Sequence, residues 1–235
     1  MSATLNDPRI AQGMRAQMAL RGQLLADGAQ QIGWKVGLGA PAAQEKLKLT
    51  APLVGFVLDR ALLESGATVP IGGWQRPVAE AEIAAYIGQD LPAHANRETV
   101  RRSIVAIGPA IELADVTCDM NDIAAVLAGD IFQRHVILGP RDIMRGGARL
   151  DGLKGRLTRS GQDVPVPADL ETNIGQIARI VGHVADIAEA MGDQLRAGQF
   201  IICGSLTPPM FLELTDTAVD FALDPIGAIS VKFSS

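Results

Sequence analysis

The fold of this chain is best indicated by one stretch, Arg76-Pro77-Val78-Ala79-Glu80-Ala81-Glu82-Ile83-Ala84-Ala85-Tyr86-Ile87. Small and apolar residues surround its two glutamates, and the pattern predicts a buried strand over Val78–Ile87. Residues two apart on a strand point to the same face, so Glu80 and Glu82 project side by side. Two such carboxylates repel each other and lose hydration, which a hard divalent cation such as Mg²⁺ or Mn²⁺ would offset.

A third acid has the same surroundings. Glu112 is the single charge in the apolar run Gly108-Pro109-Ala110-Ile111-Glu112-Leu113-Ala114. Three carboxylates from two strands would leave positions on a metal ion open for water and a chelating substrate. The residues alone are equally compatible with a solvated strand face carrying Glu80 and Glu82, and with Glu112 paired to an arginine.

Outside these strands the chain consists of short apolar runs separated by Gly and Pro. Strands are predicted over Gly33–Leu38, Val54–Leu58, Val78–Ile87, Pro109–Ala114, His135–Leu138, Gly155–Arg159, Phe200–Cys203, Ala218–Leu223 and Ala228–Phe233, with hairpin turns at 159–163 and 224–227. Helices are predicted over residues 8–27, Arg97–Ile107, Asn121–Ala128 (capped by Asn121) and Asn173–Met191. Strands outnumber helices and do not alternate with them regularly, which argues against a doubly wound parallel sheet. The pattern predicts one mainly-β domain, residues 1–235, with an N-terminal helical segment (1–30) and a β-rich core (31–235).

The composition narrows the class of protein. Twenty-one Lys and Arg against 26 Asp and Glu give a net charge of −5, which disfavours nucleic acid and anionic membranes as partners. No apolar stretch approaches the roughly 18–20 residues of a membrane span. Residues 1–7 lack the pattern of a signal peptide, and the two cysteines are far apart. These features predict a cytoplasmic enzyme with reduced thiols.

Five motifs follow one another along the chain: Gly33-Trp34-Lys35-Val36-Gly37-Leu38, Ala79-Glu80-Ala81-Glu82-Ile83, Ile111-Glu112-Leu113-Ala114-Asp115, Gly204-Ser205-Leu206-Thr207 and the closing stretch Gly227–Phe233. In this combination the chain, from about residue 33 to residue 233, resembles the fumarylacetoacetate hydrolase superfamily. Within the superfamily it is most similar to the branch of 2-keto-4-pentenoate hydratases and 2-oxo-3-hexenedioate decarboxylases.

The resemblance implies an α+β, mainly β fold: a mixed β-sandwich or rolled sheet with peripheral helices. It implies Mg²⁺ or Mn²⁺ bound by Glu80, Glu82 and Glu112, and a small 2-oxo or 2-hydroxy acid that chelates the ion. It also implies a homo-oligomer, able to associate with another enzyme of its pathway.

Lys35 is the predicted proton shuttle or enolate partner. It lies in an apolar, Gly-flanked strand, where desolvation and a neighbouring metal ion would lower its pKa towards neutrality. On composition alone, a lysine that reaches solvent or pairs with a glutamate is the alternative.

Three further residues are predicted to bind substrate. Ser205 and Thr207, in a turn after an apolar strand, offer hydroxyls and backbone N–H groups to a substrate carboxylate, although simple turn formation explains them equally well. The resemblance adds Leu38 to this set. Asp115 is expected to be structural.

One departure from the family pattern concerns the reaction. Hydratases of this type often carry an acid in a P-D-[FY]-G segment, and here Leu53 stands in its place within Ala51-Pro52-Leu53-Val54-Gly55-Phe56. Leu53 cannot transfer a proton. Glu45, Glu64 or a metal-bound water are the candidates to replace the acid, and the sequence does not choose among them.

The predicted function is a metal-dependent hydratase that adds water to 2-hydroxypenta-2,4-dienoate or a similar short unsaturated 2-oxo acid of aromatic catabolism, through an enolate chelated by the metal. The first alternative is a 2-oxo-3-hexenedioate decarboxylase, in which Arg76 could bind the far carboxylate. An acylpyruvate hydrolase ranks third, because that reaction employs a Glu–His pair that is not evident near Lys35 or Glu45. A binding protein without turnover, which Leu53 would suit, is the rival from another class.

Overall fold

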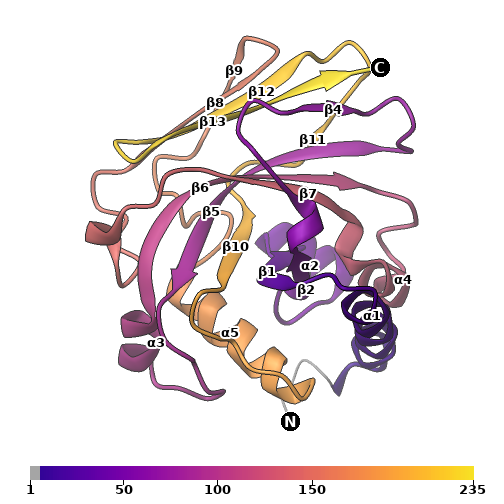
Figure 1. Cartoon of the computed structure of the whole chain (residues 1–235), viewed down its shortest axis with the longest axis vertical. Helices are drawn as coiled ribbons and strands as arrows, with labels where there is room; N and C mark the ends of the chain where they lie inside the picture. The colour runs from indigo at the N-terminus through magenta and orange to yellow at the C-terminus, as the bar shows by residue number, and fades with distance from the viewer. Residues whose placement is uncertain (1–5) are drawn as a thin grey trace.

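Two β-sheets form the body of the protein in the computed structural model, which describes residues 6–235 (Figure 1). Residues 1–5, which belong to the segment predicted to lack a signal peptide, lie outside the described residues. The larger sheet contains β1 (Gln31–Gly37), β2 (Leu53–Leu58), β3 (Leu62–Leu63), β5 (Pro77–Ile87), β6 (Ile104–Asp115), β7 (Gln133–Leu138) and β10 (Phe200–Ser205), in the order β2-β1-β10-β5-β6-β7-β3, with β11 (Met210–Phe211) paired to β5. The smaller sheet has the order β4-β13-β12-β8-β9, from β4 (Thr68–Pro70), β13 (Gly227–Ser234), β12 (Ala218–Asp224), β8 (Lys154–Arg159) and β9 (Gln162–Val164).

Both sheets are mixed. Antiparallel pairs predominate, while β1–β10, β3–β7 and β4–β13 are parallel. The two predicted hairpins are present as β8–β9 and β12–β13. The prediction of a mainly β fold with a mixed, rolled sheet is therefore confirmed.

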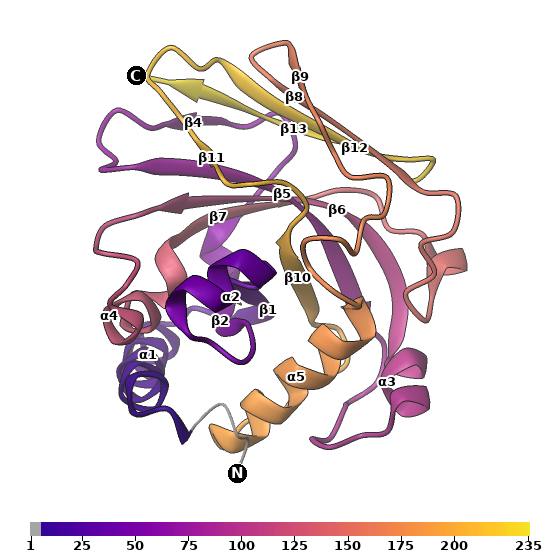
Figure 2. The ribbon, with the colours of Figure 1, turned by 180° about the vertical axis from the view of Figure 1, so that it is seen from behind.

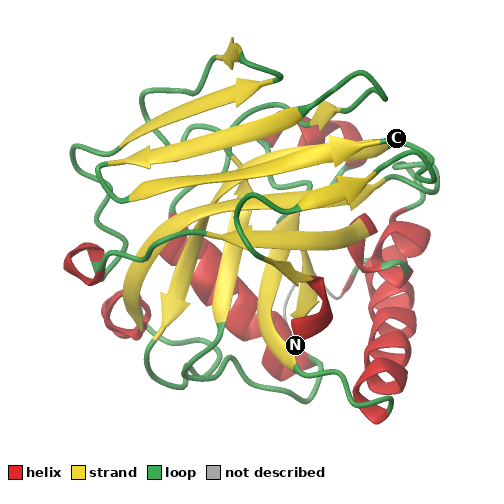
Figure 3. Ribbon diagram, turned by 45° about the horizontal axis from the view of Figure 1, so that its top comes forward, coloured by secondary structure: helices red, strands yellow, loops and turns green. Residues whose placement is uncertain are grey.

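Helices lie around the sheets (Figures 2 and 3). They are α1 (Pro8–Ala26), α2 (Pro41–Leu47), α3 (Arg97–Ser103), α4 (Ile123–Ala128) and α5 (Ile177–Ala190), together with the 3₁₀ turns η2 (Asp59–Ala61), η3 (Asp130–Phe132) and η4 (Ile143–Arg145). Helix α1 packs along α4, and the buried side of α5 lies against β1 and β10. Over residues 6–235, no helix has both the length and the apolar character needed to cross a bilayer.

The larger sheet curls strongly, and one contact demonstrates it. Lys35 on β1 forms an ion pair with Glu112 on β6, although β10 and β5 lie between these two strands. Three strand spacings in a flat sheet would separate them by about 14 Å, which exceeds the reach of the two side chains. The sheet must therefore bend until the inner faces of β1 and β6 oppose each other, as the curved ribbons in Figure 1 show.

The two faces of this curled sheet have different compositions. The outer face carries large side chains such as Trp34, Val36 and Ile201, which join the main core together with α5. The inner face carries a second, smaller apolar cluster, made up of Val57, Ala84, Ala110, Val136, Phe200 and Ile202. Lys35 and Glu112 meet on this inner face, beside its apolar cluster.

Several predicted boundaries are wrong, each for a local reason. The predicted helix 97–107 ends at Ser103, because β6 begins at Ile104 and continues through Pro109. That proline is tolerated because β7 ends at Leu138, opposite Ala110, so the ladder on that side does not require its missing N–H. The predicted helix 173–191 begins only at Ile177, since Gly175 has φ +78°.

Two further expectations differ at helix starts. Asp122, rather than Asn121, caps α4 by accepting the N–H of Ala125 at 3.0 Å. Helix α2 was not predicted, because Pro41 opens a short segment between Gly- and Pro-rich sequence that resembles a loop. The short strands β3, β4 and β11 also lack a detectable alternating pattern.

Asp115 should be a stabilising residue, as the sequence suggests. Its buried Oδ1 accepts the N–H groups of Gln75 and Arg76, both at 2.9 Å, and Arg134 pairs with its other oxygen. Asp115→Ala should lower the free energy of unfolding by about 2–3 kcal/mol, because unpaired N–H groups cost about 1–3 kcal/mol. Urea denaturation measures this loss. The exposed Asp220→Ala is the control and should change stability by less than about 1 kcal/mol; equal losses in both variants would contradict a specific role for Asp115.

Candidate metal centre

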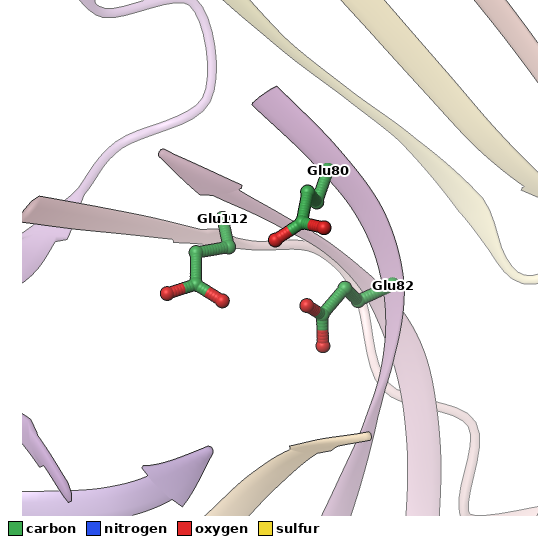
Figure 4. A group of neighbouring side chains, drawn as sticks. All are labelled: Glu80, Glu82 and Glu112. Carbon is green, nitrogen blue, oxygen red and sulfur yellow. The ribbon is translucent and has the colours of Figure 1, made fainter. Parts of the chain in front are cut away.

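Three glutamate side chains converge on the inner face of the curled sheet (Figure 4). Glu80 and Glu82 come from β5, and Glu112 is the direct cross-strand neighbour of Glu80 on β6. One carboxylate oxygen from each lies within 4.8 Å of those of the other two. Glu82 and Glu112 are both 1% exposed, whereas Glu80 keeps partial access to solvent. The alternation of β5 and its pairing with β6 are sufficient to produce this cluster.

Gly204 fixes the position of one of these carboxylates. Its backbone N–H donates to Glu82 Oε2 at 2.7 Å, from a residue with φ +98°, a conformation that glycine adopts without strain. The other oxygen, Glu82 Oε1, is buried and has no hydrogen-bond partner among the described residues. A buried carboxylate oxygen without a donor is costly, so this atom indicates a missing ligand.

Lys35, on β1, faces the three carboxylates from the opposite side of the curled sheet. Its Nζ pairs with Glu112 and donates to the carbonyl oxygen of Ile131 at 3.0 Å, and its side chain is 2% exposed. Neighbouring positions on this inner face are apolar: Ala110 lies opposite Glu82, Val136 opposite Glu112, and Ile202 opposite Lys35. The side chains at these three positions cannot solvate the charged groups.

This environment shifts the pKa values of the group. Burial, reinforced by the charge of Glu112, raises the pKa of Glu80 to about 7, against a smaller lowering by Lys35. Burial together with the charges of Glu112 and Glu80 raises the pKa of Glu82 well above its ordinary range. Burial also raises the pKa of Glu112, despite the opposing effect of Lys35. The carboxylates thus lack compensating positive charge.

The lowered pKa expected for Lys35 assumed a bound metal ion, and the chain's own charges act in the opposite direction. Burial by itself would lower the pKa of this ammonium, but the carboxylates of Glu112, Asp130 and Glu80 outweigh it and raise the pKa. The sequence suggested the opposite because the number of acids near Lys35 is visible only after the sheet has curled.

The residues fit a hard divalent ion. Opposing oxygen ligands of one ion lie roughly 4–5 Å apart, given Mg–O distances of about 2.0–2.1 Å and Ca–O distances of about 2.3–2.6 Å. The three carboxylate oxygens lie within 4.8 Å of one another, so a single ion could contact all three. The unpartnered Glu82 Oε1 and the all-oxygen donor set point to the same class of ion.

The predicted substrate-binding residues occupy different surroundings. Ser205 is the cross-strand neighbour of Glu82, and its buried Oγ has no partner among residues 6–235. Thr207 is 3% exposed and its hydroxyl donates to the carbonyl of Pro208 at 3.2 Å. Asn173 supports this turn by donating to the carbonyl of Leu206 at 2.7 Å. Leu38 follows β1 with φ +54° and packs against the main core.

Asp130 is a buried acid that the sequence analysis missed. It is 7% exposed, and its Oδ1 accepts the backbone N–H of Phe56 at 3.0 Å. Burial raises its pKa well above the ordinary value, although Lys35 and the Phe56 N–H act in the other direction. Its only sequence signal is an acid between apolar neighbours, Gly129-Asp130-Ile131-Phe132, without the alternation that marked Glu80 and Glu82.

The other candidates from the sequence lie outside the cluster. Glu45 and Glu64 are exposed, and Leu53 is buried in the main core. Arg76 directs its guanidinium to the carbonyl oxygens of Val116 and Cys118, at 3.2 and 3.0 Å.

The three histidines also have other partners. His183 Nε2 lies 2.9 Å from the carbonyl oxygen of Pro52, His94 pairs with Asp186, and His135 stacks on Trp74. The Glu–His pair of an acylpyruvate hydrolase is therefore absent from the described residues around Lys35.

Comparison with known proteins agrees with this geometry. The fumarylacetoacetate (FAA) hydrolase C-terminal family matches residues 29–234. The chain is 26% identical over 214 residues to 2-keto-4-pentenoate hydratase 1 of Dechloromonas aromatica (strain RCB), covering 89% of this chain and 80% of that protein. It is 27% identical over 217 residues to 2-hydroxyhexa-2,4-dienoate hydratase of Comamonas testosteroni, with the same coverage.

Solved structures share the fold. The 4-oxalocrotonate decarboxylase from Pseudomonas putida G7, complexed with magnesium and adipate, superposes with a TM-score of 0.85 at 20% identity, covering 99% of this chain and 90% of that one. Fumarylpyruvate hydrolase from Pseudomonas aeruginosa, in complex with Mn²⁺ and pyruvate, gives a TM-score of 0.65 at 14% identity, covering 87% and 89%. With a match over residues 29–234 and the carboxylate cluster in place, this chain belongs to the fumarylacetoacetate hydrolase family.

Proposed function

We propose that this protein is a divalent-metal-dependent lyase that adds water to 2-hydroxypenta-2,4-dienoate or a similarly short, unsaturated 2-oxo acid. The single observation that carries the proposal is the buried Glu80–Glu82–Glu112 cluster with its unpartnered oxygen, facing Lys35. The names of the hydratase relatives, which the chain matches over 80% of their length, favour this substrate class. Cytoplasmic location, homo-oligomeric assembly and association with a pathway enzyme stay predictions.

Each residue has a defined part in this proposal. Glu80, Glu82 and Glu112 would hold Mg²⁺ or Mn²⁺, which when bound supplies Lewis acidity toward the substrate's 2-oxygen and carboxylate. Lys35 Nζ holds a proton opposite the carboxylates and would pass it to C5 when the dienol ketonises, and Lys35 would be reprotonated by the proton that the 2-hydroxyl releases. Ser205 Oγ, buried beside Glu82 without a partner among residues 6–235, would donate to the substrate carboxylate. Thr207 and Leu38 stay predicted substrate-binding residues: the Thr207 hydroxyl donates to the Pro208 carbonyl, and Leu38 packs against the main core. Water then adds at C4 and gives a 4-hydroxy-2-oxo acid.

The site geometry ranks the alternatives. A dicarboxylate substrate of the decarboxylase branch requires a cation for its far carboxylate, and the Arg76 guanidinium is bound to two backbone carbonyls instead. Hydrolysis of an acylpyruvate requires a histidine beside a glutamate, whereas none of the three histidines is bonded to a glutamate among the described residues. A binding protein without turnover would have no use for a buried ammonium facing three carboxylates, since burying these charges is costly.

The first test is turnover of 2-hydroxypenta-2,4-dienoate and of 2-oxo-3-hexenedioate, followed by ultraviolet absorbance with Mg²⁺, Mn²⁺ or EDTA. We expect EDTA-sensitive loss of the dienoate and a product heavier by one water. A product lighter by one carbon dioxide from the second substrate would replace the hydratase proposal with the decarboxylase. Binding of the ion without turnover of either acid would favour the binding protein.

Glu80→Gln should lower Mn²⁺ affinity by at least about 10–100-fold, because in other metal sites even the substitution of residues that only support the ligands lowers affinity this much. Most of the turnover should be lost with it. Glu80 accepts no hydrogen bond within residues 6–235 and remains partly exposed, so the fold should persist. Titration with Mn²⁺ by electron paramagnetic resonance measures the affinity. Glu64→Gln, an exposed glutamate, is the control, and equal affinity in Glu80→Gln and Glu64→Gln would contradict the ligand role.

Lys35→Ala should spare Mn²⁺ binding while lowering kcat by about 10²–10⁴-fold, the usual contribution of a positioned acid or base. The ammonium faces the carboxylates without belonging to their donor set, which is why the two effects should separate. Steady-state kinetics beside Mn²⁺ titration makes the comparison, with the exposed Lys154→Ala as control. Turnover at the wild-type rate in Lys35→Ala would refute the catalytic role.

A further inference from the structure

The segment Asp130–Phe132 has an uncommon backbone. It packs against β2 and against β1, the strand that carries Lys35. Asp130, Ile131 and Phe132 have φ values of +53°, +52° and +65°, three consecutive left-handed residues, none of which is glycine. L-residues rarely adopt this conformation, and such strain persists only where surrounding contacts hold it. Strained backbone of this kind is concentrated at functional sites, so its contacts are informative.

Two contacts hold this turn against β1 and β2. The Phe56 N–H donates to Asp130 Oδ1 at 3.0 Å, which ties the start of the turn to β2. A side-chain carbon on Gly37 would lie 2.7 Å from Ile131 Cγ2, so only glycine at position 37 leaves room for the Ile131 side chain. A carbon on Gly55 would likewise lie 2.6 Å from Asp130 Oδ1 and 2.9 Å from Lys35 Cγ. The carboxyl of Asp130 and the stem of Lys35 therefore share the space above Gly55.

The turn also supplies a hydrogen-bond acceptor to Lys35. The Ile131 carbonyl oxygen accepts from Lys35 Nζ at 3.0 Å, and the only other acceptor of Nζ among the described residues is Glu112. The direction of this carbonyl depends on the left-handed backbone of Asp130–Phe132, which in turn depends on the Asp130–Phe56 hydrogen bond. A chain of contacts thus runs from Asp130 through the turn to the ammonium.

We propose that Asp130 is a positioning residue: it holds the left-handed turn Asp130–Phe132 so that the Ile131 carbonyl orients the Lys35 ammonium toward the carboxylate cluster. The inference deepens the proposed function, because it rests on Lys35 acting in the reaction. Asp130 acts here as a hydrogen-bond acceptor, a role its carboxyl fills whether it carries a proton or not. The raised pKa of the Asp130 carboxyl agrees with this role, since an uncharged acceptor suffices.

The test distinguishes the loss of the Asp130 acceptor oxygen from a change in backbone conformation. Asp130→Gly removes the carboxyl while keeping a residue that adopts positive φ freely, so the fold is protected. Asp130→Asn keeps an acceptor oxygen and tolerates the left-handed conformation. Asp122→Gly is the matched control, because Asp122 also accepts one backbone N–H, from Ala125, but is exposed and caps α4. Thermal unfolding of all three variants checks that they fold.

We expect kcat of Asp130→Gly to fall about 10–100-fold, the scale of effect of an ångström-sized misplacement, with KM and Mn²⁺ affinity within about threefold. Asp130→Asn should recover most of this loss, and Asp122→Gly should behave as wild type. In a Lys35→Ala background, Asp130→Gly should cause no further loss, since its effect acts through Lys35. Wild-type kcat in Asp130→Gly, equal losses in both backgrounds, or an Asn variant no better than Gly would each overturn the proposal.

A measurement without substrate keeps this test independent of the proposed function. The buried Lys35 ammonium should give a slowly exchanging signal in ¹H–¹⁵N spectra, assigned by its absence in Lys35→Ala. Asp130→Gly should shift this signal and speed its exchange, while Asp122→Gly leaves it unchanged. If wild-type protein turns over neither acid, the proposed function fails, and the ammonium signal still decides the role of Asp130. An unchanged signal would overturn it.

Discussion

The structure depends on gathering four carboxyl groups and one ammonium on the inside of a curled sheet. Lys35 reaches Glu112 only because the sheet bends through β10 and β5, and the bend in turn buries Glu82 and Glu112 and leaves Glu80 only partly exposed. Burying unpaired charge costs several kcal/mol per ion, so this arrangement is unfavourable as a purely structural device. The apolar strip formed by Ala110, Val136 and Ile202 intensifies the cost, because none of these residues offers a hydrogen bond. The side chains of the fold therefore leave part of the carboxylate charge uncompensated, and a bound cation would compensate it.

The glycines of the motifs lie where the backbone near Lys35 packs closely against other residues. A side chain at Gly33 would come within 2.7 Å of the Phe200 carbonyl on the parallel strand β10. Gly37 and Gly55 leave room for the turn Asp130–Phe132, and Gly204 turns its N–H toward Glu82. The glycine pattern around Lys35 that resembles the family motif is thus a packing requirement. A side chain at Gly33 would collide with Phe200, one at Gly37 with Ile131, and one at Gly55 with Asp130 and Lys35.

The sequence predicted the parts of the site that depend on local periodicity. Glu80 and Glu82 share a face because they are two apart on a strand, and Glu112 could be recognised as a lone charge in an apolar run. Asp130 could not be found in this way. It meets Phe56, 74 positions earlier in the chain, through a left-handed turn that no periodicity marks. The end of α3 was misplaced for a related reason, since Ile104–Ile107 suits a helix and a strand equally until the pairing with β5 decides.

The balance of charge also bears on the choice of substrate. With a divalent ion bound, the three glutamates would be offset by the ion and by Lys35 together, and burial raises the pKa of the nearby Asp130 carboxyl well above its ordinary value. A substrate with one carboxylate then adds a single negative charge, which the ion and the unpartnered Ser205 hydroxyl can accommodate. A dicarboxylate would add a second charge, and the one arginine that the sequence offered for it, Arg76, is bound to the carbonyls of Val116 and Cys118. Burial makes that second charge costly, so electrostatics favours a monocarboxylate with an apolar tail, the chemistry of a short dienoate.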